Sequence, residues 1–460
     1  MAIGSVVTSI LGTEFFAEYE REVYKKHQAL AEAEIVEHLK KLLSDVCFLR
    51  ILKQFAGISA CRFSEYRKIN IRLISGQLYE IESPIFRRTE SKKKAGRPPK
   101  RRKGIMRHLG LELLGFIERI SPALLETCVS MAVLCPSFKV AANALHGLGI
   151  YMNEHLLQNI VGRFAGVAKK ARIECNVSEV WQKAGARILV CVDGGRIRER
   201  RIKRGKRKKG LKRQGYSTEW FEPRLLIINQ FDETGQKIKS VNPILDGSCG
   251  SMDDFFQLLK DYLCSINIEE SSEIIFCADG GNGLWPRIDA LISDLNLSNA
   301  RRILDYTHAK QNMSIVKKLI SDALKLTDKA SRKLAKQIRE LLWQGDIHRI
   351  TELVRKKLSG KKKALNAALK KLNTYFGDHS KFQYKLFRNN GLPTGSGTVE
   401  SAIRRIINLR VKGSSLFWKR DNAENIIFLR SLVLTGKLRR TCHISSKIAL
   451  NALNNGGIEN

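Results

Sequence analysis

Two copies of one short pattern constrain the fold of this chain more than any other feature. In each copy an apolar run leads into one aspartate and two glycines: residues 188–192 precede Asp193, and residues 274–278 precede Asp279. An unbroken apolar run of this length, rich in β-branched side chains, predicts a strand that is buried on both faces of a sheet. A carboxylate at the end of such a strand lies where open α/β sheets usually bind their ligands.

A third strand is predicted over residues 302–304, and it also leads into an acid, Asp305. Strands that each deliver a carboxylate to their ends gather negative charge in one place. Such a site is tolerable when metal cations are bound there. The sequence therefore predicts a cation site at the edge of a sheet.

The charge of the chain points to a polyanionic partner. It has 81 Lys and Arg against 45 Asp and Glu, which gives a net charge of +36 and a pI of about 10.0. A surplus of this size favours nucleic acid as the partner, with an anionic membrane surface as the second candidate. No apolar run is long enough to span a bilayer, and the first 16 residues lack the basic start of a secretory signal.

The cysteines indicate neither a metal ribbon nor a redox motif. There are ten of them, and no two form a C-x-x-C pair. Several lie inside apolar strands, as Cys191 and Cys277 do. They are expected to be reduced, buried thiols of a cytosolic protein.

Before the first Asp-Gly-Gly the chain is expected to be mostly helical. Helix is predicted over residues 14–55, and its apolar stripe from Ile35 to Val46 faces either a core or, alternatively, a second copy of the helix. A β-hairpin is predicted over residues 68–87, with Ser75-Gly76 at its turn.

A basic linker follows at residues 91–103. Its centre, Gly-Arg-Pro-Pro-Lys at 96–100, resembles an AT-hook, a segment that lies in the narrow minor groove of DNA. A solvated run of charge is the alternative interpretation. The candidate DNA contacts here are Arg97, Lys100 and Arg101.

The next region has the pattern of a helix-turn-helix. Ser137 is a candidate N-cap for a helix that ends near Leu145, residues 146–149 make the turn, and Asn153 is a candidate N-cap for a second helix. The outer face of that second helix carries side chains able to reach base edges. An ordinary αα-hairpin is the alternative. The candidate base contacts are Gln158, Asn159 and Arg163.

The core is predicted to be α/β, with all-α regions before it and inserted into it. Its elements follow the order β-β-β-α-β-α-β, which makes a mixed sheet with its first strand near the centre. The third strand is expected at 237–245, and the run at 196–213 supplies candidate DNA contacts in Arg204 and Lys206. Three parts are expected before the core: an N-terminal helical region (1–60), a hairpin with linker (61–108) and the helix-turn-helix region (109–180). The first part of the core (181–309), a helical insertion (310–395), the closing helices of the core (396–436) and a loose tail (437–460) follow.

These motifs together resemble the DDE transposases of prokaryotic insertion sequences, which have an RNase H-like core. The closest resemblance is to the group, shared with Mutator-like transposases, that has a helical insertion before the final Glu and a D-x-x-H after the fifth strand. Asp193 and Asp279 match the two aspartates, Asp305 to His308 matches the D-x-x-H, and Glu400 matches the final Glu. Relatives often carry the cysteine pairs of a zinc ribbon near the basic linker, and this chain has none there.

The resemblance implies a catalytic site for Mg²⁺, with two ions and with Mn²⁺ as a substitute. Asp193 would bridge both ions, and Asp279 and Glu400 would each complete one. His308 either positions the scissile phosphate, or hydrogen-bonds a metal-bound acid, or is a packed histidine at a strand end. Trp418 either stacks on a flipped base or lies in the core. Candidate phosphate contacts on or just past the helix of Glu400 are Arg404, Arg405, Arg410 and Lys412.

The implied function is metal-dependent cleavage and strand transfer at the ends of a mobile element. The implied partners are double-stranded DNA and a second copy of the chain, as a homodimer or higher, in the cytoplasm at the nucleoid. A nuclease or resolvase of the same fold without strand transfer is one alternative, and a catalytically silent DNA-binding derivative is another. For the third acid, Glu424 and Glu352 are rivals, but a helix start capped by Thr398 favours Glu400.

Overall fold

The computed structural model divides the chain into two compact units, which are described separately. The first unit comprises Met1–Arg172 and Leu438–Asn460, and the second comprises Ile173–Lys437. The structure describes residues 16–58, 61–88, 106–178, 181, 186–205, 210, 214–232, 234–280, 283–395, 397–413 and 416–454. The AT-hook-like segment lies outside these described residues.

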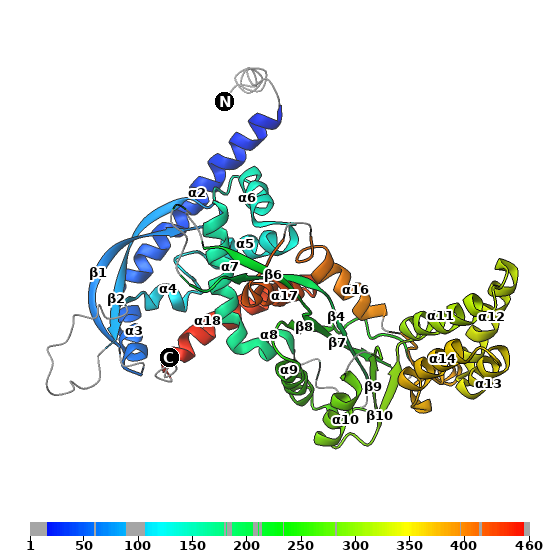
Figure 1. Ribbon diagram of the computed structural model, residues 1–460. Helices are drawn as coiled ribbons and strands as arrows, with labels where there is room; N and C mark the ends of the chain where they lie inside the picture. Colours follow the sequence, from blue (N-terminus) through cyan, green and yellow to red (C-terminus); the bar gives the residue numbers. More distant parts are fainter. Residues whose placement is uncertain are drawn as a thin grey trace. The chain divides into compact units, whose positions relative to one another are not determined.

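The first unit begins with two helices and an antiparallel hairpin, as predicted (Figure 1). The hairpin turns at Ser75-Gly76, where Gly76 has a φ of 79° that favours glycine. Of the expected apolar stripe, Leu43 is buried but Ile35 and Val46 are exposed, so only part of it faces this core. The elements are α2 (Phe16–Ser44), α3 (Val46–Ile58), β1 (Cys61–Arg72) and β2 (Leu78–Arg88).

A buried acid ties α2 to this hairpin. The Glu32 carboxylate is 1% exposed and accepts hydrogen bonds from the backbone and hydroxyl of Ser75 and from the Tyr79 hydroxyl, the last at 2.7 Å. Burial and the neighbouring Glu32 raise the pKa of Tyr79 to about 12. Because the buried charge has three donors, it fixes the turn against the helix.

Two helices in the first unit match the predicted helix-turn-helix region. Ser137 and Asn153 cap them as expected, since their side chains accept from the backbone N–H groups of Val140 and Leu156. A short strand and two further helices precede them. The elements are β3 (Met106–Arg107), α4 (Leu109–Leu113), α5 (Pro122–Leu134), α6 (Phe138–Gly147) and α7 (Glu154–Ala168).

The expectation of a loose C-terminal tail is wrong for residues 438–454, and residues 455–460 lie outside the described residues. Residues Leu438–Asn454 form α18, which packs against α4, α5 and α7 of the first unit. Its buried stripe mixes small polar and apolar side chains, namely Leu438, Thr441, Cys442 and Ser445. These positions follow helical spacing, but their polarity hides the pattern from a hydropathy argument.

The second unit is built on the predicted five-stranded mixed sheet, with its first strand in the centre. The order is β10-β9-β4-β7-β8; β9 and β10 run parallel to β4, whereas β7 is antiparallel to it (Figure 1). The strands are β4 (Arg187–Gly194), β7 (Arg224–Phe231), β8 (Ile244–Ser248), β9 (Glu273–Ala278) and β10 (Ala300–Leu304).

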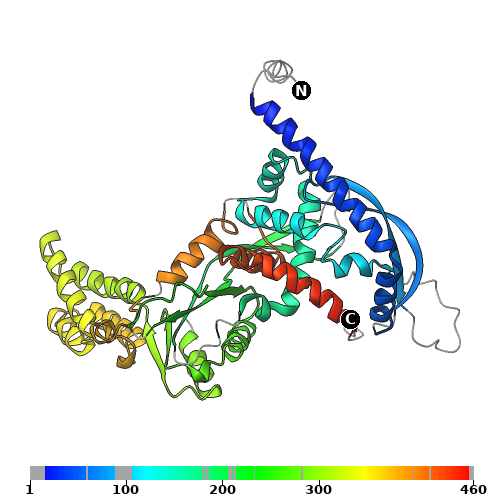
Figure 2. The same ribbon diagram turned by 180° about the vertical axis from the view of Figure 1, so that it is seen from behind.

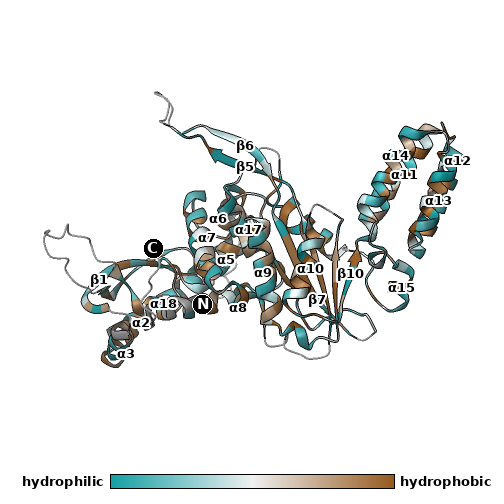
Figure 3. Ribbon diagram, turned by 60° about the horizontal axis from the view of Figure 1, so that its bottom comes forward, coloured by the Kyte–Doolittle hydropathy of each residue, from teal (hydrophilic) through white to brown (hydrophobic). Residues whose placement is uncertain are grey.

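Two expectations for this sheet need correction. The third strand is predicted at 237–245, but it runs from Ile244 to Ser248. Pro243, directly before it, has no N–H to donate to a neighbouring strand, so the strand starts after this residue. Within the basic run after Asp193, residues 197–202 form a strand, β5 (Ile197–Ile202), which pairs with β6 (Tyr216–Phe221) in a separate hairpin outside the expected order of strands. This hairpin extends away from the apolar sheet strands and is largely hydrophilic (Figure 3).

Helices cover both faces of the sheet (Figures 1 and 2). Because side chains alternate along a strand, Val190 and Val192 pack toward α9 and α10 on one face. Cys191 and Asp193 therefore point to the other face, where α16 contacts β4 and β7 and α17 contacts β8. The covering helices are α9 (Met252–Ser265), α10 (Leu284–Asp294), α16 (Gly397–Ile403), a π-helical turn η5 (Arg404–Asn408) and α17 (Arg420–Leu434).

The predicted helical insertion leaves the sheet directly after β10. Leu334, Ile338 and Leu342 form its expected buried stripe. Among the helices that the structure describes, none is both long and apolar enough for a bilayer span. All ten cysteines are free and most are buried, but Cys47 and Cys264 are exposed. The helices are α11 (Tyr306–Ala323), α12 (Asp328–Gln344), α13 (Ile347–Lys357), α14 (Lys362–Tyr375) and α15 (Tyr384–Asn389).

Candidate active site

Strand register brings the three strand-end aspartates to one edge of the sheet. Val192 of β4 pairs with Ala278 of β9, which in turn pairs with Leu304 of β10. The next residue of each strand is an aspartate, so Asp193, Asp279 and Asp305 follow at the same level. The carboxyl ends of these parallel strands thus concentrate negative charge, as the sequence predicts.

The pKa of Asp193 is shifted by its burial and by the charged groups around it. Its carboxylate accepts a hydrogen bond from the Gly194 N–H at 2.7 Å. Burial raises the pKa of Asp193 to about 6, and repulsion from Asp279 and Glu400 adds to the shift while His308 opposes it. The same four groups therefore interact electrostatically, although they come from segments far apart in the sequence.

Close packing surrounds the described glycines that follow Asp193 and Asp279. A Cβ on Gly194 would overlap the Glu222 carboxylate, and one on Gly195 would lie 2.7 Å from a methyl of Ile407. A Cβ on Gly280 would overlap the ring of Tyr375, whose hydroxyl accepts from the Gly280 N–H at 3.0 Å. The Asp-Gly-Gly pattern thus lets the closing helices and the insertion approach the acids.

Tyr375 is a site neighbour that the sequence does not reveal. It lies at the end of α14, 95 positions after the Gly280 N–H that it contacts. Burial raises the pKa of Tyr375 to about 12, with repulsion from Asp279 and Asp305 in the same direction. No local pattern marks this tyrosine, because only the folded insertion brings it to β9.

Asp305 and His308 form a fixed pair at the start of α11. Asp305 is fully buried and caps the helix by accepting from the His308 N–H at 2.8 Å, and its carboxylate also lies 3.2 Å from His308 Nδ1. The hydrogen bond to Asp305 raises the pKa of His308 to about 9, against the effect of burial. In the metal-free protein at neutral pH the pair therefore carries an imidazolium beside the acids.

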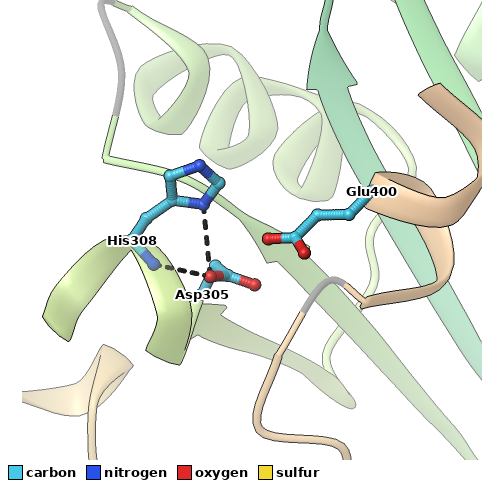
Figure 4. A group of neighbouring side chains, drawn as sticks. All are labelled: Asp305, His308 and Glu400. Atoms are coloured by element: carbon cyan, nitrogen blue, oxygen red, sulfur yellow. Dashed lines mark hydrogen bonds and ion pairs between the residues drawn. The ribbon is translucent and has the colours of Figure 1, made fainter. Parts of the chain in front are cut away.

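Glu400 completes the cluster from the opposite side. It lies in the first turn of α16, and its carboxylate points toward Asp305 and His308 across the site (Figure 4). One ligand atom each of Asp305, His308 and Glu400 lies within 4.8 Å of the others, so this group could hold a metal ion. Asp305 and His308 lie at the start of α11 and Glu400 lies in α16, so the three side chains come from segments that are distant in the sequence.

The expected cap of this helix needs correction. α16 begins at Gly397, so Thr398 lies inside the first turn instead of preceding it. The Thr398 hydroxyl lies 3.7 Å from Cys191 Sγ on β4 and is oriented as its donor. A contact with the central strand, together with buried Ile406 and Ile407, therefore fixes the direction of Glu400.

The rival acids lie elsewhere. Glu424 accepts a hydrogen bond from the Cys249 N–H at 3.0 Å, just past β8 at the far edge of the sheet. Glu352 lies on α13 in the insertion, and its carboxylate is 3.5 Å from His348 Nδ1. Of the candidate third acids, the structure brings Glu400 together with Asp193, Asp305 and His308.

The candidate nucleic-acid contacts of the second unit are mostly at its surface. Arg404 and Arg405 in η5, Lys412 after it and Arg204 beyond β5 are exposed. Arg410 is instead 2% exposed, with its guanidinium 5.3 Å from the centre of the Trp418 ring, so we leave it out of the proposed interface. Lys206, like Arg97, Lys100 and Arg101, lies outside the described residues.

Trp418 belongs to the core. It is 9% exposed, and its indole N–H donates to the Val411 carbonyl at 2.9 Å. The alternative of a base-stacking Trp418 is therefore not supported by its position. Its backbone also pairs with β5, which holds the chain after η5 against the hairpin.

In the first unit, the outer face of α7 presents the three expected side chains. Gln158, Asn159 and Arg163 are exposed, whereas Leu157 and Ile160 are buried. Arg163 forms an ion pair with Glu118 of the same unit. A DNA phosphate or base would have to replace Glu118 as the partner of this arginine.

We expect alanine variants of Gln158, Asn159 and Arg163 to lose the preference for end-bearing DNA that the resemblance implies, while total DNA affinity is kept, because base contacts specify and phosphate contacts position. Binding to end-bearing and unrelated duplexes, measured by fluorescence anisotropy, checks this. Lys139→Ala on α6 is the control, because Lys139 is exposed and removing its charge should lower affinity for all DNA alike without changing the preference. Equal preference in wild type and variants would favour a plain αα-hairpin.

Comparison with known proteins does not assign the chain to a family. No protein-family model matches it, and no curated protein matches it significantly. The function is therefore inferred from the residues and geometry of the site.

Proposed function

We propose that the protein is a DDE transposase that cleaves and transfers DNA strands at the ends of a mobile element. The observation that carries the proposal is a group of acids at one edge of the sheet in a chain with a net charge of +36. Asp193 interacts electrostatically there with Asp279, Glu400 and His308, and ligand atoms of Asp305, His308 and Glu400 lie within 4.8 Å of one another. An acidic centre in so basic a protein suits chemistry on a polyanion that is carried out with cations.

The architecture supports the same function. The order β-β-β-α-β-α-β, the central first strand and the helix that returns Glu400 to it are those that the resemblance to RNase H-like transposases implies. The β5–β6 hairpin and the helical insertion are additions to that order. Both lie in the segments between the matched acids, so they leave the carboxylate edge of the sheet intact.

The acids fit hard divalent cations. Asp193, Asp279 and Glu400 offer carboxylate oxygens, the ligands preferred by Mg²⁺ and Mn²⁺. Burial raises the pKa of Asp193, and repulsion from Asp279 and Glu400 adds to the rise, so a bound cation would relieve both effects. Bound Mg²⁺ would supply Lewis-acid stabilisation of charge and an acidified attacking hydroxyl or water.

The remaining groups would place the DNA. The imidazolium of His308, held by Asp305, lies beside the acids and can bind a non-bridging oxygen of the scissile phosphate. Arg404 and Arg405, exposed on η5 just after Glu400, can bind the neighbouring phosphates. These contacts would hold the strand so that its reacting phosphate faces the carboxylates.

The pKa of Asp193 predicts how cation binding depends on pH. A carboxylate must lose its proton to bind a metal, and the pKa of Asp193 is about 6. We expect Mn²⁺ affinity, measured by electron paramagnetic resonance, to be level between about pH 7 and 8 and to fall up to about tenfold per pH unit below the Asp193 pKa. Asp193→Asn should weaken binding at every pH and remove this fall, and an unchanged pH profile in that variant would contradict the role of Asp193.

The test of the proposed function is strand transfer. Purified protein, an end-bearing duplex and a supercoiled target plasmid should give plasmid joined covalently to the duplex, only with Mg²⁺ or Mn²⁺. Cleavage without joining would favour a nuclease or resolvase, and binding without cleavage a silent derivative. We further propose that a homodimer or higher assembly at the nucleoid brings two ends together, which sedimentation with DNA would detect.

A further inference from the structure

The face of the β5–β6 hairpin beside the chain that follows η5 forms a small pocket with an arginine–aromatic lining. The pocket has a volume of about 280 Å³, and Ile197, Arg198, Trp220, Val411, Lys412 and Leu416 line it. Ile197 and Val411 are each 1% exposed, and Trp220 is 51% exposed. The floor of the pocket is apolar and the Trp220 indole is half-exposed at its side, which suits the binding of one small planar group.

The cations around the indole are held in place by cross-strand pairing. Arg198 pairs with Trp220 across the hairpin, and its guanidinium lies 5.1 Å from the centre of the Trp220 ring and 5.7 Å from that of Phe417. Arg196 lies 5.9 Å from the Trp220 ring. Further along the same face, Arg200 lies 4.4 Å from the ring of Tyr216.

The acids of the hairpin lie on its other face. Glu199 and Glu219 alternate with Arg198 and Arg200 along the strands, so their side chains point to the face opposite Arg198 and Trp220. There Glu199 forms ion pairs with Arg201 and Arg420 at 3.0 Å each. The residues that line the pocket, Arg198, Trp220 and Lys412 among them, therefore combine cations with a π face and include no acid, which is complementary to a nucleotide.

The backbone ties this pocket to the proposed active site. Arg198 follows Asp193 by five positions, which limits the distance between their Cα atoms to about 18 Å. Trp418 exchanges two backbone hydrogen bonds with β5, at 2.8 and 3.0 Å, and this holds the segment after η5 against the hairpin. A nucleotide close to a phosphate at the acids can therefore reach the pocket.

We propose that this pocket captures one unpaired base of the DNA strand next to the scissile phosphate. The base stacks on Trp220, and Arg198 and Lys412 bind the phosphates that flank it. A paired base is stacked within the duplex and cannot enter, so the pocket selects DNA with a frayed or single-stranded end. This inference rests on the proposed function only in placing the pocket beside the scissile phosphate.

The experiment measures binding of two DNA probes to the full-length protein with Ca²⁺, so that no cleavage intervenes. One probe is a blunt duplex, and the other carries a short single-stranded overhang with 2-aminopurine. Wild type should bind the overhang probe about tenfold more tightly, because each stacked base adds to affinity. Stacking on the indole should also quench the fluorescence of 2-aminopurine.

Variants assign these signals to the pocket. Trp220→Ala should abolish both the preference and the quenching, and Trp220→Phe should keep part of each. Arg201→Ala is the matched control, because it removes a cation from the opposite face of the same strand and should change neither. Melting temperatures close to that of wild type show that the variants are folded, as expected for half-exposed side chains.

The possible outcomes distinguish failure of the proposed base-binding pocket from failure of the proposed function. Equal binding of both probes by wild type, without quenching, overturns the pocket even if Mg²⁺-dependent cleavage is found. Preference and quenching that survive Trp220→Ala overturn it as well. Preference and quenching that depend on Trp220, in a protein that never cleaves DNA with Mg²⁺, support the pocket and overturn the proposed chemistry.

Discussion

Glu400→Gln should reduce Mg²⁺-dependent nicking of an end-bearing duplex by about 10³-fold or more, which corresponds to at least about 4 kcal/mol of transition-state stabilisation. The substitution keeps the shape of the side chain but removes a charged oxygen ligand from a cation site. DNA affinity should stay equal or rise, because one negative charge near the phosphates is removed. Gel assays of nicking, with anisotropy measurements of binding, would show the two effects separately.

Glu424→Gln is the matched control for this prediction. Glu424 is also a helical glutamate near the end of the chain, but it binds the Cys249 N–H beyond β8 and not the acid cluster. Its replacement should leave nicking within a few-fold of wild type in folded protein. If Glu400→Gln cleaves like wild type and Glu424→Gln does not, the third acid is misassigned.

DNA affinity should fall steeply with salt and should depend on the basic linker. A protein that neutralises about 6–10 phosphates loses about 10³–10⁵ in affinity between about 50 and 200 mM salt. Replacing the basic residues of 92–103 by Ser and Gly should flatten the slope of log affinity against log salt by about 0.9 for each phosphate that the protein no longer neutralises. Titrations at several salt concentrations provide the slope.

The control removes charge from the helical insertion. Lys361, Lys362 and Lys363 are exposed at the start of α14, and their replacement by Ser lowers the net charge without touching the linker. It should change the slope much less. A slope that is unchanged by the linker substitutions would remove residues 92–103 from the DNA interface.

The sheet and its acids were predictable because they depend on local patterns. The apolar runs before Asp193 and Asp279 are long enough to identify buried strands, and the order of elements places them side by side. The two helix caps at Ser137 and Asn153 were predictable for the same reason, since a cap is a contact over three residues.

The parts that were missed depend on contacts between distant segments. The β5–β6 hairpin is hidden in a run of charge, although the alternation in Arg198, Glu199 and Arg200 and the aromatic residues near Trp220 are compatible with strands. The burial of Arg410 and the approach of Tyr375 to Gly280 come from tertiary packing and have no local pattern. The stripe of α18 was missed because two of the five buried residues that the structure describes there, Thr441 and Ser445, are polar.

Anomalous diffraction from crystals of the protein with Mn²⁺ and an end-bearing duplex would locate the divalent cations that the acids are proposed to hold for chemistry on DNA. We expect two Mn²⁺ peaks about 3.5–4 Å apart, with Asp193 between them and Asp279 and Glu400 on either side. A single peak bound by Asp305, His308 and Glu400 with no contact to Asp193, or no peak at this edge of the sheet, would contradict this expectation.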